Sequence, residues 1–276
     1  MTSNAKNKEN ENSEKRDTEY QPLITANYNK KGAQFIVFLE YCAIILIILF
    51  TNKYFYQYMF EENLWLITLL PLSIYGLIWQ FALYSLIIGG IIYKILVKIE
   101  PPKEGTFELD GREFHFYCYR FWIAYYTLWT LRAMPLPWVD MYGFKLFGVK
   151  VGKDVVLYDS WIDIEFVEIG DHVMLSLNTA VFSHCIYRDK FLVQRVVVEK
   201  NAIVGAEALV APGTHIEEGA IIGAASTTHI GQRLKDYRIH VGTPCSKTFP
   251  IRIVEKDEEN ENEEKKGIKK SKEEKR

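Results

Sequence analysis

Paired cysteines and clustered basic residues are both missing from this chain of 276 residues. The four cysteines lie far apart with no CxxC motif, which indicates reduced thiols and excludes a zinc knuckle or a disulfide framework. Lysine and arginine number 33 against 35 acidic residues, for a net charge of −2, and no basic face gathers anywhere. We therefore expect no nucleic-acid partner.

Apolar residues are scarce at both ends of the chain. Residues 1–16 are almost entirely Asn, Lys, Glu and Ser, and the last twenty or so residues are blocks of Glu and Lys. Such composition cannot bury enough surface to offset the entropy of ordering. We predict disordered tails over residues 1–32 and 253–276, and we assign no function to either.

Two apolar runs predict a transmembrane helical hairpin over residues 33–105. Residues 35–50 are almost wholly apolar, and residues 64–93 contain no charged side chain. A helix over the second run would be about 45 Å long, more than one bilayer crossing needs. Proline fits the first turn of a helix, so we place the second span at residues 71–93, beginning at Pro71.

Charges around the hairpin indicate its orientation. Lysines precede and follow the hairpin, whereas its loop holds one: Lys30, Lys31, Lys94, Lys98 and Lys103 against Lys53. The positive-inside rule then places both ends, and the domain that follows, in the cytoplasm. Glu40 is the one charge in the first run. Its carboxylate either snorkels to the cytoplasmic interface or hydrogen-bonds the neighbouring helix, and we favour snorkelling.

Aromatic residues crowd the stretch after the hairpin. Residues 114–138 also carry Arg120 and Arg132 and end in a proline pair. A helix lying in the membrane interface explains this composition better than a third span. We therefore predict interfacial or linker helices over residues 106–150.

A six-residue period runs through the second half of the chain. Aliphatic residues recur at every sixth position in two blocks, Val151, Leu157, Ile169, Leu175 and Val181, then Val198, Val204, Val210, Ile216 and Ile222. Glycine often follows the aliphatic residue, and the fifth position is often small. This period is typical of short strands that turn a corner every six residues, with one aliphatic side chain per turn pointing into a narrow prism. It predicts a parallel β-helix.

The sequence VVVEKNAIVGAEALVAPGTHIEEGAIIGAAS, followed by HVGTPCSK, resembles the hexapeptide-repeat acyltransferases, most closely the galactoside and maltose O-acetyltransferases. The resemblance implies a left-handed β-helix domain over residues 151–252, a homotrimer, and acetyl-CoA as co-substrate. The membrane segment and the aromatic stretch that leads into GVKVGKDVVL also resemble the terminal domain of some non-ribosomal peptide synthetases.

Breaks in the six-residue register point to a site. The register is interrupted by an insertion that follows His184, and the resemblance implies that this histidine is the general base that takes a proton from the acceptor. A loop histidine without a catalytic role is the alternative. Asp163 breaks the register once more: either the turn bulges there, or the carboxylate orients a partner such as a histidine. We favour the bulge. Asn178 and Arg188 are further candidates for contacts with the acceptor.

The resemblance also implies where acetyl-CoA would bind. Small residues of the later turns would let the pantetheine arm lie along the prism, and a lysine would reach a phosphate: Gly205, Ala206, Gly223, Ala224, Ser226 and Lys247. The other histidines that fall in turns, His172, His215 and His229, fit solvated or packing roles better.

Taken together, these features predict a membrane-anchored acyltransferase, acting on a hydroxyl or amine that the sequence does not identify. A catalytically silent β-helix scaffold is the alternative from another class. A γ-carbonic-anhydrase-like metalloenzyme is a third, although no closely spaced histidine pair follows His184. We expect no bound metal.

Overall fold

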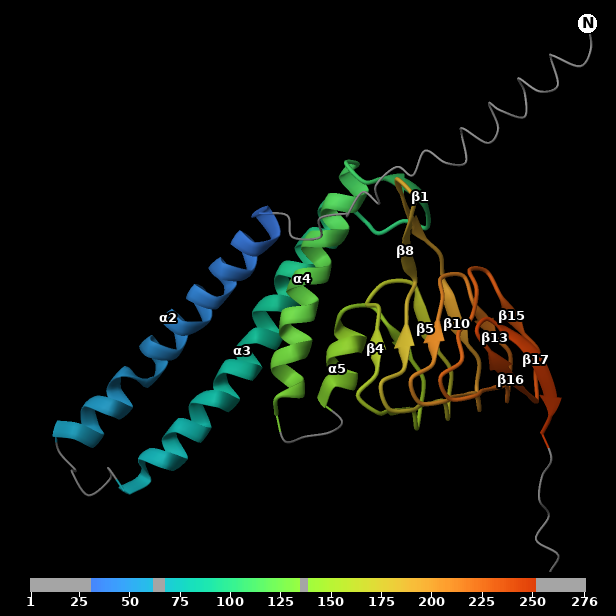
Figure 1. The fold of residues 1–276 in the computed structure, drawn as a ribbon. Helices are drawn as coiled ribbons and strands as arrows, with labels where there is room; N and C mark the ends of the chain where they lie inside the picture. The colour runs from blue at the N-terminus through green and yellow to red at the C-terminus, as the bar shows by residue number, and fades with distance from the viewer. Residues whose placement is uncertain (1–30, 62–67, 135–138, 252–276) are drawn as a thin grey trace, which may run out of the picture.

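The computed structural model describes residues 31–61, 68–134 and 139–251. Both predicted tails lie outside the described residues, except that Lys31 and Gly32 begin the first helix. A helical layer comprises α2 (Lys31–Glu61), α3 (Leu70–Ile99), α4 (Arg112–Arg132) and α5 (Val139–Leu146). Short strands over residues 150–250 make up the rest, which we call the parallel-sheet region. Figure 1 shows the helical layer on one side of the molecule and the strands on the other.

Helices α2 and α3 form the predicted hairpin and are longer than expected. Helix α3 starts at Leu70, with Pro71 in its first turn, and runs to Ile99, six residues past the predicted end of the span. By length and composition, Gly32–Tyr58 and Leu70–Ile99 could each cross a membrane. Only 17% and 33% of their most apolar windows are buried, so much of their apolar surface faces outward.

Helix α4 packs lengthwise against α3, in the opposite direction, which places it inside the helical layer. Near its end the Thr127 hydroxyl donates to the Ser85 carbonyl over 3.4 Å, and further back the Arg120 guanidinium donates to the Glu100 carbonyl over 2.9 Å. Glycine permits this close approach, because a Cβ on Gly89 would lie 2.4 Å from the Thr127 hydroxyl. Helix α4 therefore packs along the hairpin, and its place in a membrane interface stays a prediction.

Glu40 does not snorkel. Its side chain is 2% exposed and points between α3 and α4, where a Cβ on Gly89 would lie 2.9 Å from one carboxyl oxygen. Neither carboxyl oxygen has a hydrogen-bond partner within the described residues, so the alternative of a bond to the neighbouring helix is not seen either. The preference for snorkelling is wrong because the contact of three helices closes over the side chain.

The strands of the second half form three parallel sheets, which the chain enters in a repeating order. Each of the first three turns contributes one strand to sheet 1, one to sheet 2 and one to sheet 3, in that order, and the last two turns contribute strands to sheets 1 and 2 alone. Sheet 1 comprises β2 (Lys150–Val151), β5 (Val167–Ile169), β10 (Val196–Val198), β13 (His215–Ile216) and β15 (Arg233–Leu234). Sheet 2 comprises β3 (Val156–Leu157), β6 (Met174–Leu175), β11 (Ile203–Val204), β14 (Ile221–Ile222) and β16 (Arg238–Gly242), with β17 (Cys245–Pro250) antiparallel at its edge. Sheet 3 comprises β4 (Trp161–Ile162), β7 (Ala180–Val181) and β12 (Leu209–Val210).

The aliphatic residues of the six-residue period form the core between these sheets. The side chains of Leu175, Val181, Val204, Val210 and Ile222 are fully buried. Each lies directly against its counterpart in the next turn, as in the pairing of Val204 with both Leu175 and Ile222. Turns stack closely enough that a Cβ on Gly205 would lie 2.5 Å from the Ala224 nitrogen. The inward positions predicted from the period are confirmed as the core.

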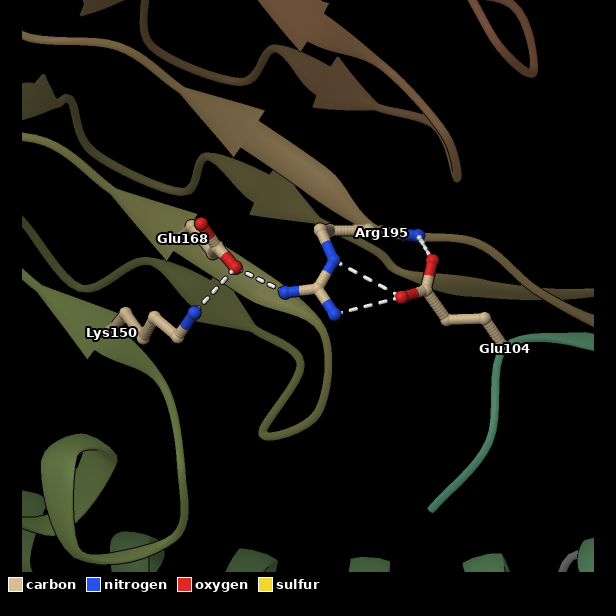
Figure 2. Close-up of polar contacts among 4 residues, drawn as sticks. All are labelled: Glu104, Lys150, Glu168 and Arg195. Carbon is tan, nitrogen blue, oxygen red and sulfur yellow. Dashed lines mark hydrogen bonds and ion pairs between the residues drawn. The ribbon is translucent and has the colours of Figure 1, made fainter.

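The insertion is a β-hairpin and not an irregular loop. Strands β8 (His184–Tyr187) and β9 (Lys190–Val193) pair antiparallel, and β1 (Gly105–Glu108), from the segment after α3, pairs with the other edge of β9. A chain of charges links the same segment to sheet 1 (Figure 2): Glu104 accepts hydrogen bonds from Arg195, which pairs with Glu168, which accepts a bond from Lys150 over 2.8 Å. These contacts join the helical layer to the parallel-sheet region.

Candidate active site

His184 lies at the corner between sheet 3 and sheet 1, where the hairpin leaves the parallel-sheet region. Its Nδ1 atom is 2.5 Å from Oδ2 of Asp163, and the two side chains are 12% and 5% exposed. Ser183 donates to the same oxygen from its backbone nitrogen over 2.7 Å and from its hydroxyl over 3.1 Å. The carboxylate is thus held by three donors. This contact places the imidazole proton on Nδ1 and makes Nε2 the hydrogen-bond acceptor of the ring.

Asp163 reaches His184 because the turn departs from the six-residue spacing. Trp161 and Ile162 pair with Ala180 and Val181, so Ile162 occupies the inward position that the period assigns to residue 163. Asp163 then falls on the corner that also carries His184. The turn is thus irregular at this position, as we favoured, and the irregular spacing also brings the carboxylate to the imidazole, so the two alternatives occur together.

Tyr117 of α4 covers the histidine. Its hydroxyl lies 2.8 Å from Nδ1 and 3.3 Å from Nε2 of His184, and the two ring centroids are 4.9 Å apart. Since Asp163 already accepts the proton on Nδ1, the hydroxyl is placed to donate to Nε2. Phe191 packs against the Tyr117 ring from β9, with centroids 4.7 Å apart. A substrate hydroxyl or amine that bonds to Nε2 would compete with the Tyr117 hydroxyl for that nitrogen.

A buried ion pair fixes α4 above the site. The Arg120 guanidinium and the Glu165 carboxylate are 4% and 3% exposed and hydrogen-bond to each other through two nitrogens. Burial raises the pKa of the Glu165 carboxyl, and the adjacent guanidinium opposes that shift. Arg120 lies one helical turn after Tyr117, so this pair holds the segment of α4 that covers His184.

A cleft of about 240 Å³ reaches Glu165 from the side of α3 and α5. Tyr93, Phe147 and Ile164 line its apolar part, and Lys150, Glu168 and Arg195 of the charge chain in Figure 2 lie at its polar side. Neither His184 nor Asp163 lines this cleft. A substrate would therefore have to reach His184 from outside this cleft.

The residues predicted to bind acetyl-CoA meet along a different corner. Gly205 and Ala206 follow β11, and the turn after β14 holds the other three small residues, so all five lie between sheet 2 and sheet 3. Stacking brings the two turns together, as Ala225 donates to the Ala206 carbonyl over 2.8 Å. Lys247 lies on β17 opposite Val241, at the end of the same stack. His184 lies at the opposite edge of sheet 3, between sheet 3 and sheet 1, so within one chain sheet 3 stands between it and these residues.

Of the predicted acceptor contacts, only Asp163 lies beside His184. Asn178 is on the turn between β6 and β7, at the corner that carries the predicted acetyl-CoA residues, with φ of 56°. Arg188 is at the tip of the hairpin, beyond the far end of β8 from His184, and its guanidinium lies over the Tyr187 ring. The structure does not bring these two side chains to the histidine.

Other histidines lie on the surface or in packing positions. His215 Nε2 is 2.6 Å from Glu199 on the outward face of sheet 1, and His172 Nδ1 is 3.7 Å from Asp154. His229 is exposed. Across residues 31–61, 68–134 and 139–251, no group of three or more His, Cys, Asp or Glu side chains could hold a metal ion.

Three residues of this site escaped the sequence analysis. Tyr117 is one aromatic residue among many, and its contact with His184 spans 67 positions. Ser183 precedes the histidine but carries no pattern of its own. Glu165 gives a usable signal, since a second carboxylate two positions after Asp163 in an otherwise apolar stretch indicates a buried, paired charge.

No protein-family model matches this chain, and no curated protein matches it. Among solved structures, a maltose O-acetyltransferase from Clostridium difficile 630 is similar at 24% identity over 38% of this chain and 59% of its own, with a TM-score of 0.35. A hexapeptide-repeat acetyltransferase from Vibrio cholerae is similar at 14% identity over 48% and 89% of the two chains, with a TM-score of 0.38.

Soybean serine acetyltransferase, solved with serine, is similar at 15% identity over 62% of this chain and 57% of its own, with a TM-score of 0.33. These neighbours are acetyltransferases. The chain spans 59% of the length of the first of them, and identity and TM-score are low throughout. Similarity at this level does not show the chemistry of the chain, which depends on its own residues.

Proposed function

We propose that this chain is a membrane-anchored acyltransferase that moves an acyl group, acetyl in the simplest case, from a coenzyme A thioester to a hydroxyl or amine. The buried pair of His184 and Asp163 carries the proposal. A histidine whose Nδ1 proton is held by a fixed carboxylate is oriented to act as a base through Nε2, as in other enzymes that activate a nucleophile.

In the proposed reaction, the acceptor takes the place of the Tyr117 hydroxyl at Nε2 of His184. The imidazole removes the acceptor proton as the acceptor oxygen or nitrogen attacks the thioester carbonyl. The carbon–sulfur bond then breaks, and the proton passes from His184 to the sulfur of the departing coenzyme A. Asp163 stabilises the imidazolium that exists between these two transfers. The products are the acylated acceptor and free coenzyme A.

The proposal includes a left-handed β-helix that assembles as a homotrimer. Sheet 2 offers support, because its outward row is aliphatic from turn to turn: Val156, Met174, Ile203, Ile221 and Ile239. A row of this kind is typical of a surface that another copy covers. A second copy would also bring the corner with the predicted acetyl-CoA residues to His184, which sheet 3 separates within one chain.

The membrane anchor is the third part of the proposal. Leu46, Phe50 and Leu72 on the hairpin are 66%, 76% and 67% exposed, and they belong to wide apolar faces. Soluble proteins rarely leave such faces in water, whereas lipid would cover them. From the lysine distribution, we place both ends of the hairpin and the parallel-sheet region in the cytoplasm.

Binding of coenzyme A to the purified, detergent-solubilised chain tests the function directly. We expect a calorimetric titration to show saturable binding, and we expect His184→Ala to bind as the unaltered chain does. Transfer of labelled acetyl groups to a panel of hydroxyl and amine acceptors then tests turnover. If coenzyme A fails to bind at millimolar concentration, the acyltransferase proposal is wrong and the scaffold alternative replaces it. Light scattering of the same sample tests the trimer.

A further inference from the structure

Aromatic rings of α4 stack in a continuous row that ends on the parallel-sheet region. Tyr117, Phe121 and Tyr125 recur every fourth residue, which places them on one helix face. Their ring centroids are 6.0 and 5.6 Å apart, with planes within 25° and 16° of parallel. Trp161 of β4 continues the row, 5.8 Å from Tyr125 and within 18° of parallel. We call these four residues the aromatic ribbon.

The ribbon has a catalytic end and an open end. At the first, the Tyr117 ring lies against His184, as described above. At the second, the Trp161 side chain is 46% exposed and lies beside Trp129 of α4, which is 63% exposed. A pocket of about 50 Å³ separates them, lined also by Leu128 and Phe144 and almost entirely apolar except for Arg132. The ribbon therefore connects an open apolar pocket with the proposed base.

Packing of α4 alone does not account for the open end. Helix α4 buries Thr127 against α3 and Leu131 against Gly143 of α5. Trp161 points outward from sheet 3, where it stacks on the Tyr125 ring and the Arg132 guanidinium lies 5.7 Å from its ring centroid. Two tryptophans that stay half-exposed around an apolar pocket form a surface that an apolar ligand would cover.

The open end lies at the depth of the candidate membrane span. Thr127, two residues before Trp129, contacts α3 at Ser85 and Gly89. The first exposed lysine of α3, Lys94, comes five residues later, about 8 Å along the helix. If α3 crosses the bilayer, Trp129 therefore lies at the level of the hydrocarbon, whereas Tyr117, about 18 Å further along α4, lies at the site.

We infer that the aromatic ribbon binds a lipid acceptor, whose hydrocarbon chain stays at Trp129 and Trp161 while its hydroxyl or amine headgroup lies along the ring faces to His184. This inference rests on the proposed function and names the substrate class of the same site. Flat, apolar ring faces suit a chain that slides between bilayer and enzyme, because they offer contact area without fixed polar partners.

Photo-crosslinking to the full chain in vesicles tests this. The probe is a phosphatidylethanolamine that carries a diazirine in its acyl chain, mixed into phosphatidylcholine, and labelled residues are mapped by mass spectrometry. We expect labels on Trp129, Tyr125 and Trp161 in addition to the exposed faces of α2 and α3. Trp161→Ala should lower the label on Tyr125 and Trp129 about fivefold, as expected for the loss of one aromatic contact.

Three controls separate the outcomes. Trp161→Phe keeps a ring and should keep the label, whereas Phe249→Ala, on an exposed aromatic residue at the far end of the parallel-sheet region, should change nothing. Labels on α2 give an internal standard for correct insertion and folding. Labels confined to α2 and α3 would overturn the inference, and so would labels on α4 whose amount does not change in Trp161→Ala. Turnover of a water-soluble acceptor, with no label on the aromatic ribbon, would overturn it as well. Coenzyme A binding is measured in parallel: if it fails while the ribbon is labelled, the lipid site stands and the proposed reaction does not.

Discussion

Two histidines of this chain are each paired with a carboxylate at almost the same distance, yet the two pairs lie in very different surroundings. His184 and Asp163 are 2.5 Å apart under α4, with side chains 12% and 5% exposed. His215 and Glu199 are 2.6 Å apart on the open face of sheet 1, with side chains 31% and 40% exposed. Water screens the second pair and lets both groups move. Both pairs therefore have a short contact between histidine and carboxylate. The His184 pair differs because it is buried and because its carboxylate accepts additional hydrogen bonds, which makes His184 the candidate base.

Each histidine also has an arginine–carboxylate pair nearby, and these differ in the same way. Arg120 and Glu165 are buried beside Asp163, whereas Arg233, whose side chain is 67% exposed, pairs with Glu217 next to the His215 strand. Sheet 1 therefore offers a matched, solvent-exposed control for every charged residue of the candidate site.

Removal of each imidazole gives the largest expected difference. His184→Ala should lower the rate of acyl transfer by about 10²–10⁴-fold, the usual loss when a general base is removed. His215→Ala should leave the rate within a few-fold, because its pair is exposed and remote from the site. Labelled acetyl transfer measures both. Equal rates for the two variants would remove His184 from the mechanism.

Breaking each arginine pair should separate the two regions in stability. Arg120→Met leaves the Glu165 carboxylate buried without a partner, at a cost of about 3–5 kcal/mol in free energy of unfolding. Arg233→Met should cost less than about 1 kcal/mol, as expected for an exposed pair. Urea titration of the detergent-solubilised chain, followed by tryptophan fluorescence, gives both values. Similarly small losses of stability in both variants would mean that water reaches the Glu165 carboxylate.

Neutralising each carboxylate should have an intermediate effect on the rate. Asp163→Asn removes a hydrogen bond to a charged acceptor, worth about 1.5–3 kcal/mol, or roughly 10- to 100-fold in turnover at about 1.4 kcal/mol per tenfold. Glu199→Gln should not change turnover. Coenzyme A binding should be unaffected in both variants, and its loss in Asp163→Asn would point to a collapsed site in place of a disoriented imidazole.

Tyr117→Phe should give the smallest effect, and in the opposite direction. The acceptor no longer has to displace a hydroxyl from Nε2 of His184, and a net hydrogen bond of about 1 kcal/mol corresponds to a roughly fivefold lower KM for the acceptor. We expect kcat to stay within a few-fold, because the ring remains. A kcat that falls with an unchanged KM would show that Tyr117 takes part in proton transfer and does not merely cover the base.

Local patterns in the sequence predicted the core and the hairpin well. Val204 and Ile222 were assigned inward positions because a six-residue turn repeats the same environment, and burial confirms this. The hairpin followed from its length and apolar composition, although α3 runs to Ile99 because charged side chains after Tyr93 do not end a helix.

Contacts between residues far apart in the sequence could not be predicted from such local patterns. Asp163 meets His184 because Ile162 takes the inward position; the six-residue period revealed the break at residue 163 but not which side chain the carboxylate contacts. Tyr117 meets His184 across 67 positions, and Glu40 is buried by a helix whose packing the aromatic composition did not predict. The break in the period pointed to His184, whose catalytic role stays a prediction, and most of the residues around it were missed.

The outer strand of the His184 hairpin has a consequence for how this chain can be divided. Strand β1 borders β9 along its whole length and belongs to the segment before α4, not to the parallel-sheet region. A truncated protein that began at residue 140 would retain the buried aliphatic core, but β9 would lose its neighbour and Tyr117 would be gone. The bare strand would then be free to recruit strands from other molecules. The parallel-sheet region therefore cannot be cut away at residue 140 with the His184 corner intact, and joining it to another helical hairpin would require residues 105–132 to be kept with it.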